Sequence, residues 1–220
     1  QRWYYHCYKL GVMVWQDMPN LWEPDGEDSL AVRDEFRSEW KTIIDQHISS
    51  PSIVTWVVFN ANWGAFDVRE ITDWTKRYDP TRLVNGHTGY NYAPGYRKAY
   101  GDPGNGDFID IHTYGKIAPN EMAKPTPTRV ASLGEFGGKG LFVRDHMWPV
   151  RNDAYEMMTS TRQLTDKYVY LLTEVEQMKL YHGLSAAIYT QTTDLEHEIN
   201  GLVTYDRHVE KMEIDRVREI

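Results

Sequence analysis

The sequence has little cysteine, no long apolar run and no excess of positive charge. Its single cysteine, Cys7, excludes an internal disulfide framework and any multi-cysteine zinc site. No run of about 18 or more apolar residues occurs, so no membrane span is predicted. The 24 Lys and Arg against 32 Asp and Glu give a net charge of −8, which argues against binding to a nucleic-acid backbone. Neither nucleic acid nor a membrane is therefore expected as a partner.

Aromatic residues are abundant by contrast, with 8 Trp and 15 Tyr among 220 residues. Such rings fill cores, and they also line pockets for sugars and other flat-faced ligands. The length lies between one and two domains of about 150 residues and is ample for a hydrophobic core. Because no linker, repeat or low-complexity segment interrupts the sequence, we predict a single domain over residues 1–220.

Strand and helix patterns alternate along the chain. Apolar runs predict six strands, at 12–15, 52–59, 83–85, 108–111, 130–133 and 184–189. Helical spacing predicts four helices, over 1–10, 36–48, 68–78 and 164–182. This alternation is typical of parallel βα units, wound as an open sheet or closed as a barrel. Either arrangement gathers chemistry at the carboxyl ends of the strands.

The ends of the predicted strands carry side chains suited to a pocket. They are Gln16 and Asp17, Asn60 to Trp63, His87, His112 to Tyr114, Glu135, and Gln191 with Asp194. Polar residues also follow strands simply because loops are polar. Glu135 is the most informative of them, because glycines on both sides allow backbone or ligand to approach closely. By contrast, Glu196 to Glu198 is interpreted as a solvated acidic loop without ligand spacing for a metal.

Three motifs in the correct order resemble those of glycoside hydrolase family 2. Residues 51–64 (PSIVTWVVFNANWG) resemble its strand-four signature, 134–138 (GEFGG) its strand-seven signature, and 15–19 (WQDMP) its strand three. The segment 189–201 is also similar to relatives of these enzymes. The resemblance implies an α/β fold of the (β/α)8 TIM-barrel type behind β-sandwich domains. It implies a retaining exo-β-glycosidase that cleaves β-linked sugars with two glutamates and without a cofactor or metal.

The resemblance also implies roles for individual residues. Glu135 matches the nucleophile, Asn60 the asparagine that steadies the sugar 2-hydroxyl, and Tyr114 the tyrosine that positions the nucleophile. The remaining strand-end residues would form the walls of a carbohydrate pocket, namely Asp17, Trp63, His87, His112 and Gln191.

The acid/base glutamate of the family is absent, because Ala61 follows Asn60 where the family has glutamate. General acid–base catalysis contributes about 10²–10⁴-fold, so turnover of ordinary glycosides should fall at least that far. Three explanations are open. Ala61 is an engineered substitution, or a natural loss that leaves a carbohydrate-binding pseudoenzyme, or another carboxylate such as Asp67 or Glu70 replaces the glutamate. The third is disfavoured because Asp67 is predicted to cap a helix.

A closed barrel of this type has eight strands, and only six are predicted. The first two βα units and the sandwich domains would precede Gln1, so we expect the chain to be completed by the rest of its own polypeptide or by a partner. An open sheet would leave two strand edges exposed. A periplasmic or secreted location is what many bacterial relatives suggest; the sequence itself leaves the compartment, the sugar and the oligomeric state open.

Overall fold

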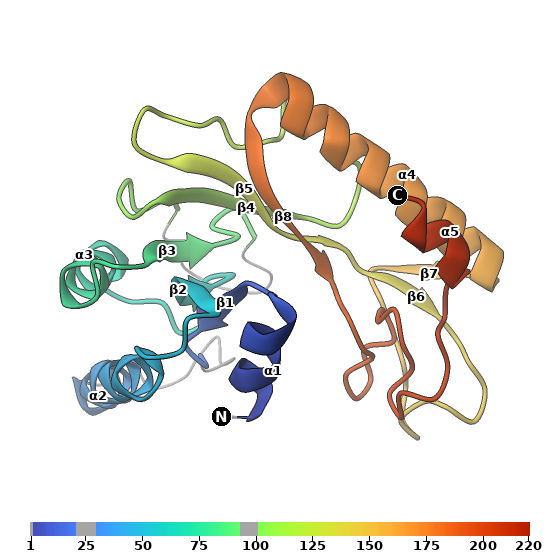
Figure 1. Ribbon diagram of the computed structural model, residues 1–220, viewed down its shortest axis with the longest axis horizontal. Helices are drawn as coiled ribbons and strands as arrows, with labels where there is room; N and C mark the ends of the chain where they lie inside the picture. The colour runs from blue at the N-terminus through green and yellow to red at the C-terminus, as the bar shows by residue number, and fades with distance from the viewer. Residues whose placement is uncertain (1, 21–29, 93–100) are drawn as a thin grey trace. The chain divides into compact units, whose positions relative to one another are not determined.

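The computed structural model describes residues 2–20, 30–92 and 101–220, which form two compact units. The N-terminal unit comprises Gln1–Ile111 and Pro125–Val130. The C-terminal unit comprises His112–Lys124 and Ala131–Ile220. Each unit is described by itself below, with the element labels of Figure 1.

The N-terminal unit contains a three-stranded sheet in which the strands lie in chain order. Both neighbouring pairs are parallel, and the order is β1 (Val14–Asp17), β2 (Ile53–Asn60) and β3 (Leu83–Thr88). Three helices accompany the sheet, α1 (Arg2–Leu10), α2 (Leu30–His47) and α3 (Val68–Tyr78). Strand, helix and parallel strand therefore follow one another as the sequence pattern predicts (Figure 1).

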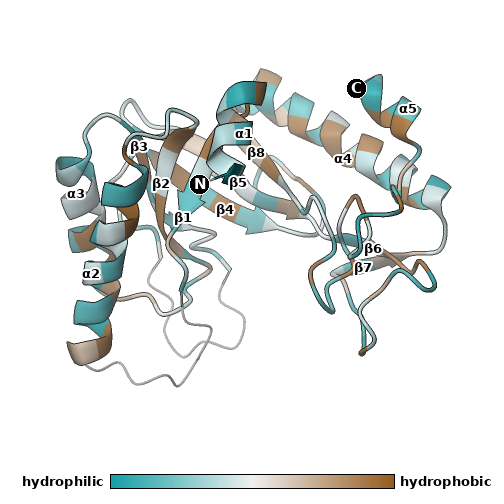
Figure 2. Cartoon of the chain, turned by 60° about the horizontal axis from the view of Figure 1, so that its bottom comes forward, coloured by the Kyte–Doolittle hydropathy of each residue, from teal (hydrophilic) through white to brown (hydrophobic). Residues whose placement is uncertain are grey.

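Two tryptophans lie at the centre of the core of this unit. Trp40 of α2 and Trp56 of β2 are fully buried and meet edge to face. Each indole N–H has an acceptor, Thr75 Oγ1 at 2.9 Å for Trp40 and Asp79 Oδ2 at 2.8 Å for Trp56. Figure 2 shows hydrophilic and hydrophobic residues alternating along α2 and α3, as expected for helices with one face on a core. This packing fixes β2, and with it the turn that follows.

The C-terminal unit is built around β5 and the long helix α4. Its elements are β5 (Val130–Gly137), β6 (Lys139–Leu141), β7 (Glu156–Met158), α4 (Thr161–His182), β8 (Leu184–Thr190) and α5 (Ile214–Arg218). β4 (Phe108–Thr113) spans the boundary of the two units in sequence, and the sheet has the order β4-β5-β8. β5 and β8 are parallel, as are β6 and β7. α4 packs on β6, β7, β8 and α5.

Helix α4 begins and ends with well-formed caps. The Ser160 side chain accepts a hydrogen bond from the Gln163 N–H at the start. At the end Gly183 adopts φ 75°, a left-handed conformation that glycine enters without steric cost. The apolar stripe that predicts this helix is buried at Leu164 and Leu171.

All six predicted strands and all four predicted helices are present, although Gln1 lies outside the described residues. The predicted strands end too early, most clearly at β5, which continues from residue 133 to Gly137. Three short elements were not predicted, β6, β7 and α5, because three to five residues carry too little periodicity. The described strands form separate sheets and no closed barrel. Nor does any helix within the described ranges reach the length and apolarity that crossing a membrane requires.

Candidate active site

Glu135 lies on a β-bulge near the carboxyl end of β5. Leu133 pairs with Ala187 and Phe136 pairs with Tyr189, so β5 carries one more residue than β8 over this stretch. A bulge of this kind turns a side chain out of the regular alternation of the strand. The expectation that Glu135 follows the strand is therefore corrected: it lies within the strand, at an irregular position.

Two side chains meet the Glu135 carboxylate. The Tyr114 hydroxyl donates a hydrogen bond to Glu135 Oε2, and His112 Nδ1 lies 3.6 Å from the same oxygen. Burial lowers the pKa of His112 to about 3, so its imidazole is neutral at physiological pH. Burial, and then the charge of Glu135, raise the pKa of Tyr114, so its phenol keeps the proton that it donates. The Tyr114 hydroxyl thus orients the carboxylate as a neutral donor.

Tyr114 is itself held on several sides. The Tyr155 ring stacks on it with centroids 3.4 Å apart and planes inclined by 4°. Lys139 Nζ donates to the Tyr114 carbonyl at 2.7 Å and pairs with Glu156 at 2.7 Å. A Cβ at Gly138 would lie 2.4 Å from the Tyr155 ring, so the stack requires glycine there. Sequence reasoning missed both Tyr155 and Lys139, because β6 and β7, which bring them to Tyr114, were not predicted.

A second carboxyl group belongs to this site. Gln191, the residue after β8, donates to Glu198 Oε2 at 3.1 Å and to Asn200 Oδ1 at 2.6 Å. Burial raises the pKa of Glu198, and the negative charge of Glu135 adds to the effect. Glu198 is therefore close enough to Glu135 for the two charges to interact.

The prediction of a solvated acidic loop holds for Glu196 and His197, which are exposed, and is wrong for Glu198. Glu198 is half-buried, and Asp194 nearby is buried and bonded to Lys211 Nζ at 2.6 Å. The Asp153 N–H donates to the His197 carbonyl at 2.9 Å and fixes the backbone before Glu198. Partners distant in sequence bury Asp194 and half-bury Glu198, which no local pattern signals.

The turn after β2 carries the sequence-predicted residues of the N-terminal unit. Asn60 ends the strand, and its Oδ1 accepts a hydrogen bond from Thr88 Oγ1 at 3.0 Å. Ala61 (φ 47°) and Asn62 (φ 66°) then adopt left-handed backbone conformations. For non-glycine residues such conformations cost about 1–3 kcal/mol each, and they cluster at functional sites. Ala61 is 3% exposed, so position 61 lies inside the turn and not on its surface.

His87 and Trp63 adjoin that turn, whereas Asp17 is exposed at the end of β1. His87 Nε2 accepts from the Asn62 N–H at 3.2 Å, and its Nδ1 lies 3.0 Å from the Gly101 carbonyl. A proton on Nδ1 satisfies both contacts. The Trp63 indole N–H is buried and has no acceptor among the described residues.

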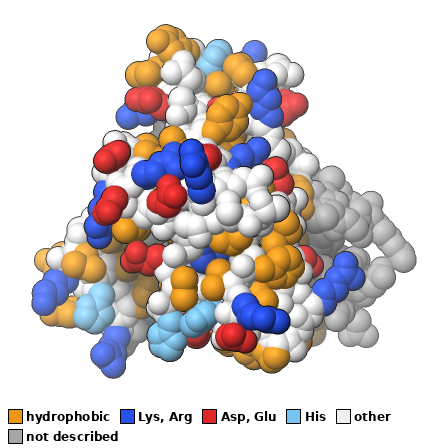
Figure 3. Space-filling view, turned by 90° about the vertical axis from the view of Figure 1, so that its right-hand side faces the viewer, with side chains coloured by type: hydrophobic (Ala, Val, Ile, Leu, Met, Phe, Trp, Pro, Cys, Tyr) orange, Lys and Arg blue, Asp and Glu red, His pale blue; other side chains and the backbone are white. Residues whose placement is uncertain are grey.

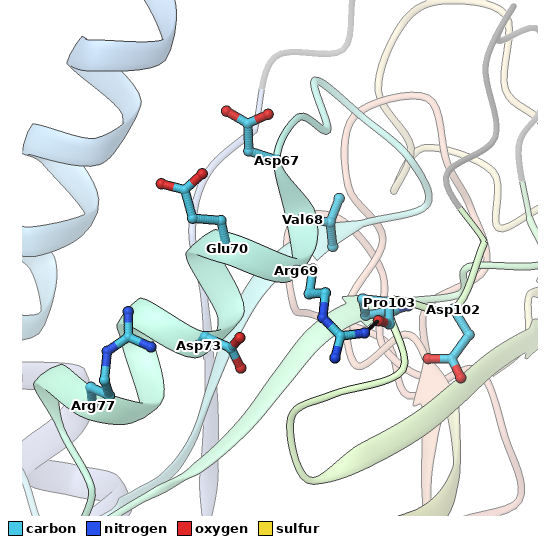
Figure 4. A pocket seen from close by; sticks show the side chains of 8 residues that line it. All are labelled: Asp67, Val68, Arg69, Glu70, Asp73, Arg77, Asp102 and Pro103. Atoms are coloured by element: carbon cyan, nitrogen blue, oxygen red, sulfur yellow. Dashed lines mark hydrogen bonds between the residues drawn. The ribbon is translucent and has the colours of Figure 1, made fainter.

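Asp67 occupies the N-cap position of α3 as predicted, but its side chain makes no capping bond. It pairs instead with Arg37 at 2.8 Å and Arg33 at 3.4 Å. Figure 4 shows Asp67 and Glu70 at a pocket of about 770 Å³ beside α3. Four acidic and two basic side chains line it, and none of the described residues that line it is aromatic, so these residues offer no stacking surface for a sugar.

No protein-family model matches the sequence, and no curated protein is similar to it. Several solved structures share its fold. A β-glucuronidase from an uncultured Clostridium sp. has 12% identity and a TM-score of 0.65, and the match covers 99% of this chain and 42% of that one. An FMN-binding β-glucuronidase from Facaelibacterium prausnitzii L2-6 has 19% identity and a TM-score of 0.63, with 96% and 35% covered. A glycoside hydrolase family 2 β-galacturonidase from Eisenbergiella tayi bound to galacturonate has 15% identity and a TM-score of 0.61, with 99% and 42% covered.

At these identities the likeness concerns the fold alone. The matched region is 35% of the length of the F. prausnitzii enzyme and 42% of the other two. The chain therefore has the fold of one part of these longer enzymes, which agrees with the resemblance of its strand-end motifs to glycoside hydrolase family 2.

Proposed function

We propose that the chain is part of the catalytic (β/α)8 barrel of a retaining exo-β-glycosidase of the family 2 type. Its reaction is the cleavage of an O-glycosidic bond at the non-reducing end of a β-linked sugar. The observation that carries the proposal is Glu135 on the β5 bulge, held by the Tyr114 hydroxyl beside the neutral His112. The fold likeness to glucuronidases and a galacturonidase supports it.

In this proposal Glu135 attacks the anomeric carbon and forms a covalent glycosyl-enzyme, which water then hydrolyses. Tyr114 holds the attacking oxygen through its hydrogen bond. Asn60 binds the sugar 2-hydroxyl, a contact that strengthens in the transition state. Glu198, whose pKa is raised in part by the charge of Glu135, accepts hydrogen bonds from sugar hydroxyls in the same subsite.

The missing group in this mechanism is the proton donor. Ala61 occupies the acid/base position, and a methyl group neither protonates a leaving oxygen nor activates water. Without it, sugars with poor leaving groups lose about 10²–10⁴-fold in turnover, whereas activated aryl glycosides still react with Glu135. In retaining enzymes the two carboxyl groups lie roughly 5–5.5 Å apart, the separation that a glutamate at position 61 would have to reproduce.

Ala61 also favours a second function, that of a carbohydrate-binding pseudoenzyme. The Trp63 indole N–H and the Asn60 amide bind sugar whether or not hydrolysis follows. Loss of the acid alone would leave this binding intact.

The decisive experiment compares Ala61→Glu with Ala61→Gln, a variant of matched size that transfers no proton. The substrates are aryl β-glycosides with good and poor leaving groups, beginning with glucuronides and galacturonides and extending to galactosides and mannosides. We expect Ala61→Glu to exceed Ala61→Gln by about 10²–10⁴-fold on poor leaving groups. Azide should raise turnover by the Ala61 protein and yield a β-glycosyl azide.

The two functions give different results in this experiment. Sugar binding by calorimetry, with no hydrolysis from Ala61→Glu and no azide product, would establish the binding protein. Absence of both binding and turnover across the panel would refute both functions.

A further inference from the structure

Two histidines and an aspartate converge in the C-terminal unit, and none of them belongs to the site described above. His146 follows β6, whereas Asp206 and His208 follow β8. His146 Nδ1 lies 2.7 Å from Asp206 Oδ2, and His208 Nδ1 lies 3.1 Å from the same oxygen. One ligand atom from each residue lies within 4.8 Å of the other two, and within the described ranges no other three side chains of this kind come so close.

The Asp206 carboxylate is oriented so that one oxygen is left for the imidazoles. Its Oδ1 accepts hydrogen bonds from Thr204 Oγ1 at 2.7 Å and from the His208 backbone N–H at 3.1 Å. Its Oδ2 is the atom that both imidazole rings face. Outer hydrogen bonds of this sort fix the orientation of carboxylate ligands at metal sites.

Asp206 and His208 both lie in a closed turn of the backbone over residues 204–209. The Arg207 N–H donates to the Thr204 carbonyl at 2.8 Å, and the Thr204 N–H donates to the Val209 carbonyl at 3.0 Å. Arg207, between the two ligands, adopts φ 62° and directs its guanidinium to the Tyr205 carbonyl. Its positive charge is therefore engaged by a backbone oxygen of the same turn.

An ion from solvent can reach the three side chains. The His146 and Asp206 side chains are each 32% exposed, and that of His208 is 75% exposed. Figure 3 shows one face of the molecule, on which histidine side chains are exposed next to acidic ones.

We propose that His146, Asp206 and His208 form a site for a divalent first-row transition metal ion, with zinc as the best-fitting representative. Two imidazole nitrogens and one carboxylate oxygen are a ligand set that zinc accepts, with a fourth position open to water. An ion about 2.1 Å from each ligand atom would place those atoms about 3.4 Å apart. The contacts at 2.7 and 3.1 Å then need to open by less than about 1 Å, and the third pair, which lies within 4.8 Å, needs to close by at most about 1.4 Å. The bound ion would join two segments that are 60 residues apart in sequence.

The experiment titrates the chain with zinc chloride by calorimetry and with cobalt chloride by visible absorption. It compares the parent with His146→Ala, His208→Ala and Asp206→Asn. The matched control is His182→Ala, an exposed histidine at the end of α4 that is not part of the cluster. We expect one zinc per chain, tetrahedral cobalt bands, and a rise in Tm with zinc. Each cluster variant should weaken binding at least about 10-fold and lose the rise in Tm, as befits the loss of one of three ligands.

His208→Ala keeps the test valid if other variants unfold, because His208 is largely exposed and its loss leaves the core intact. In the parent, zinc should also shift the imidazole resonances of His146 and His208 and leave those of His182 unchanged. Saturable binding that His208→Ala retains, or equal weakening by His182→Ala, would overturn the proposal. So would the absence of saturable binding by the parent, and the cluster would then be an Asp–His hydrogen-bonded network alone.

Discussion

The turn after β2 and the bulged end of β5 are two strand ends to which the family resemblance assigns catalytic glutamates. Both have left-handed backbone conformations, at Ala61 (φ 47°) and Asn62 (φ 66°) in the first and at Gly137 (φ 97°) and Gly138 (φ 61°) in the second. In the turn after β2 these conformations fall on residues with a Cβ, and no titratable side chain is present at position 61. At the end of β5 they fall on glycines beside Glu135.

The two strand ends differ in how their backbone shape relates to their side chains. Left-handed non-glycine residues are costly and persist only where the surroundings impose them. The β2 turn therefore keeps an expensive backbone shape at Ala61 and Asn62, two residues with a Cβ. The β5 end keeps both its shape and its carboxylate.

The largest effect is expected from removing the Glu135 carboxylate at the bulged end of β5. Glu135→Gln, placed in the Ala61→Glu background, should lower turnover to or below the level of Ala61→Gln, a loss of at least about 10²–10⁴-fold, because an amide cannot form the glycosyl-enzyme. Steady-state rates on an aryl glycoside and intact-mass detection of the trapped intermediate measure this. Retained turnover would show that Glu135 is not the nucleophile.

Gly137→Ala tests whether glycine is needed for shape at the same strand end. A Cβ at Gly137 would lie 2.2 Å from the Tyr189 ring, and φ 97° is strained for alanine. We expect a loss of about 3 kcal/mol in the free energy of unfolding, measured by urea denaturation. Gly115→Ala is the matched control, because a Cβ there meets nothing within 4 Å, and it should stay within about 0.5 kcal/mol of the parent. Equal losses from both variants would contradict the packing argument.

Tyr114→Phe tests the orientation of the nucleophile. The variant removes the hydroxyl that donates to Glu135, and hydrogen bonds to charged groups contribute about 1.5–3 kcal/mol. In the Ala61→Glu background kcat/KM should fall roughly 10- to 100-fold. Tyr170→Phe removes a comparable tyrosine–glutamate bond on the surface of α4 and should leave kcat/KM unchanged. An unchanged kcat/KM in Tyr114→Phe would mean that the hydroxyl does not position Glu135.

The sequence predicts more of the elements than of the site. Continuous apolar runs and helical stripes locate every long element, because burial imposes those periods on the chain. Tyr155, Lys139 and Glu198 were not predicted as site residues, because pairing between distant segments places them. Asp67 lies at the predicted N-cap position, but its carboxylate pairs with Arg33 and Arg37 of α2 and makes no capping bond.

Glu198 provides a test that needs no substrate. Burial, with the charge of Glu135, raises the folded-state pKa of Glu198 above its unfolded value. The favourable contribution of protonated Glu198 to the free energy of unfolding is therefore present below the unfolded-state pKa. It is lost as pH rises through the folded-state pKa. Glu198→Gln should gain stability relative to the parent as pH rises from about 4 to about 7 in urea denaturation. A pH-independent difference would show that Glu198 does not titrate in this range.

Asp79 of the N-terminal unit should behave in the opposite way. Burial favours its protonation, but hydrogen bonds from Thr81, Trp56 and Arg82 outweigh burial and lower its pKa. Its contribution is therefore present above the unfolded pKa and lost as pH falls through the folded pKa. Asp79→Asn should cost most at neutral pH and progressively less in acid.

The smallest expected effect concerns the strain at position 61. Ala61→Gly relieves about 1–2 kcal/mol of left-handed strain but adds about 0.5–1 kcal/mol of unfolded-chain entropy and removes a buried methyl worth about 0.8 kcal/mol. These terms nearly cancel, so the free energy of unfolding should change little. Ala65→Gly, close by but without positive φ, has the same entropic cost, a smaller cost for its half-buried methyl and no relief, and should lose about 1 kcal/mol. The difference between the two variants in urea denaturation measures the strain directly. If both lose equally, the turn holds Ala61 without strain, and the contrast in backbone strain between the two strand ends fails.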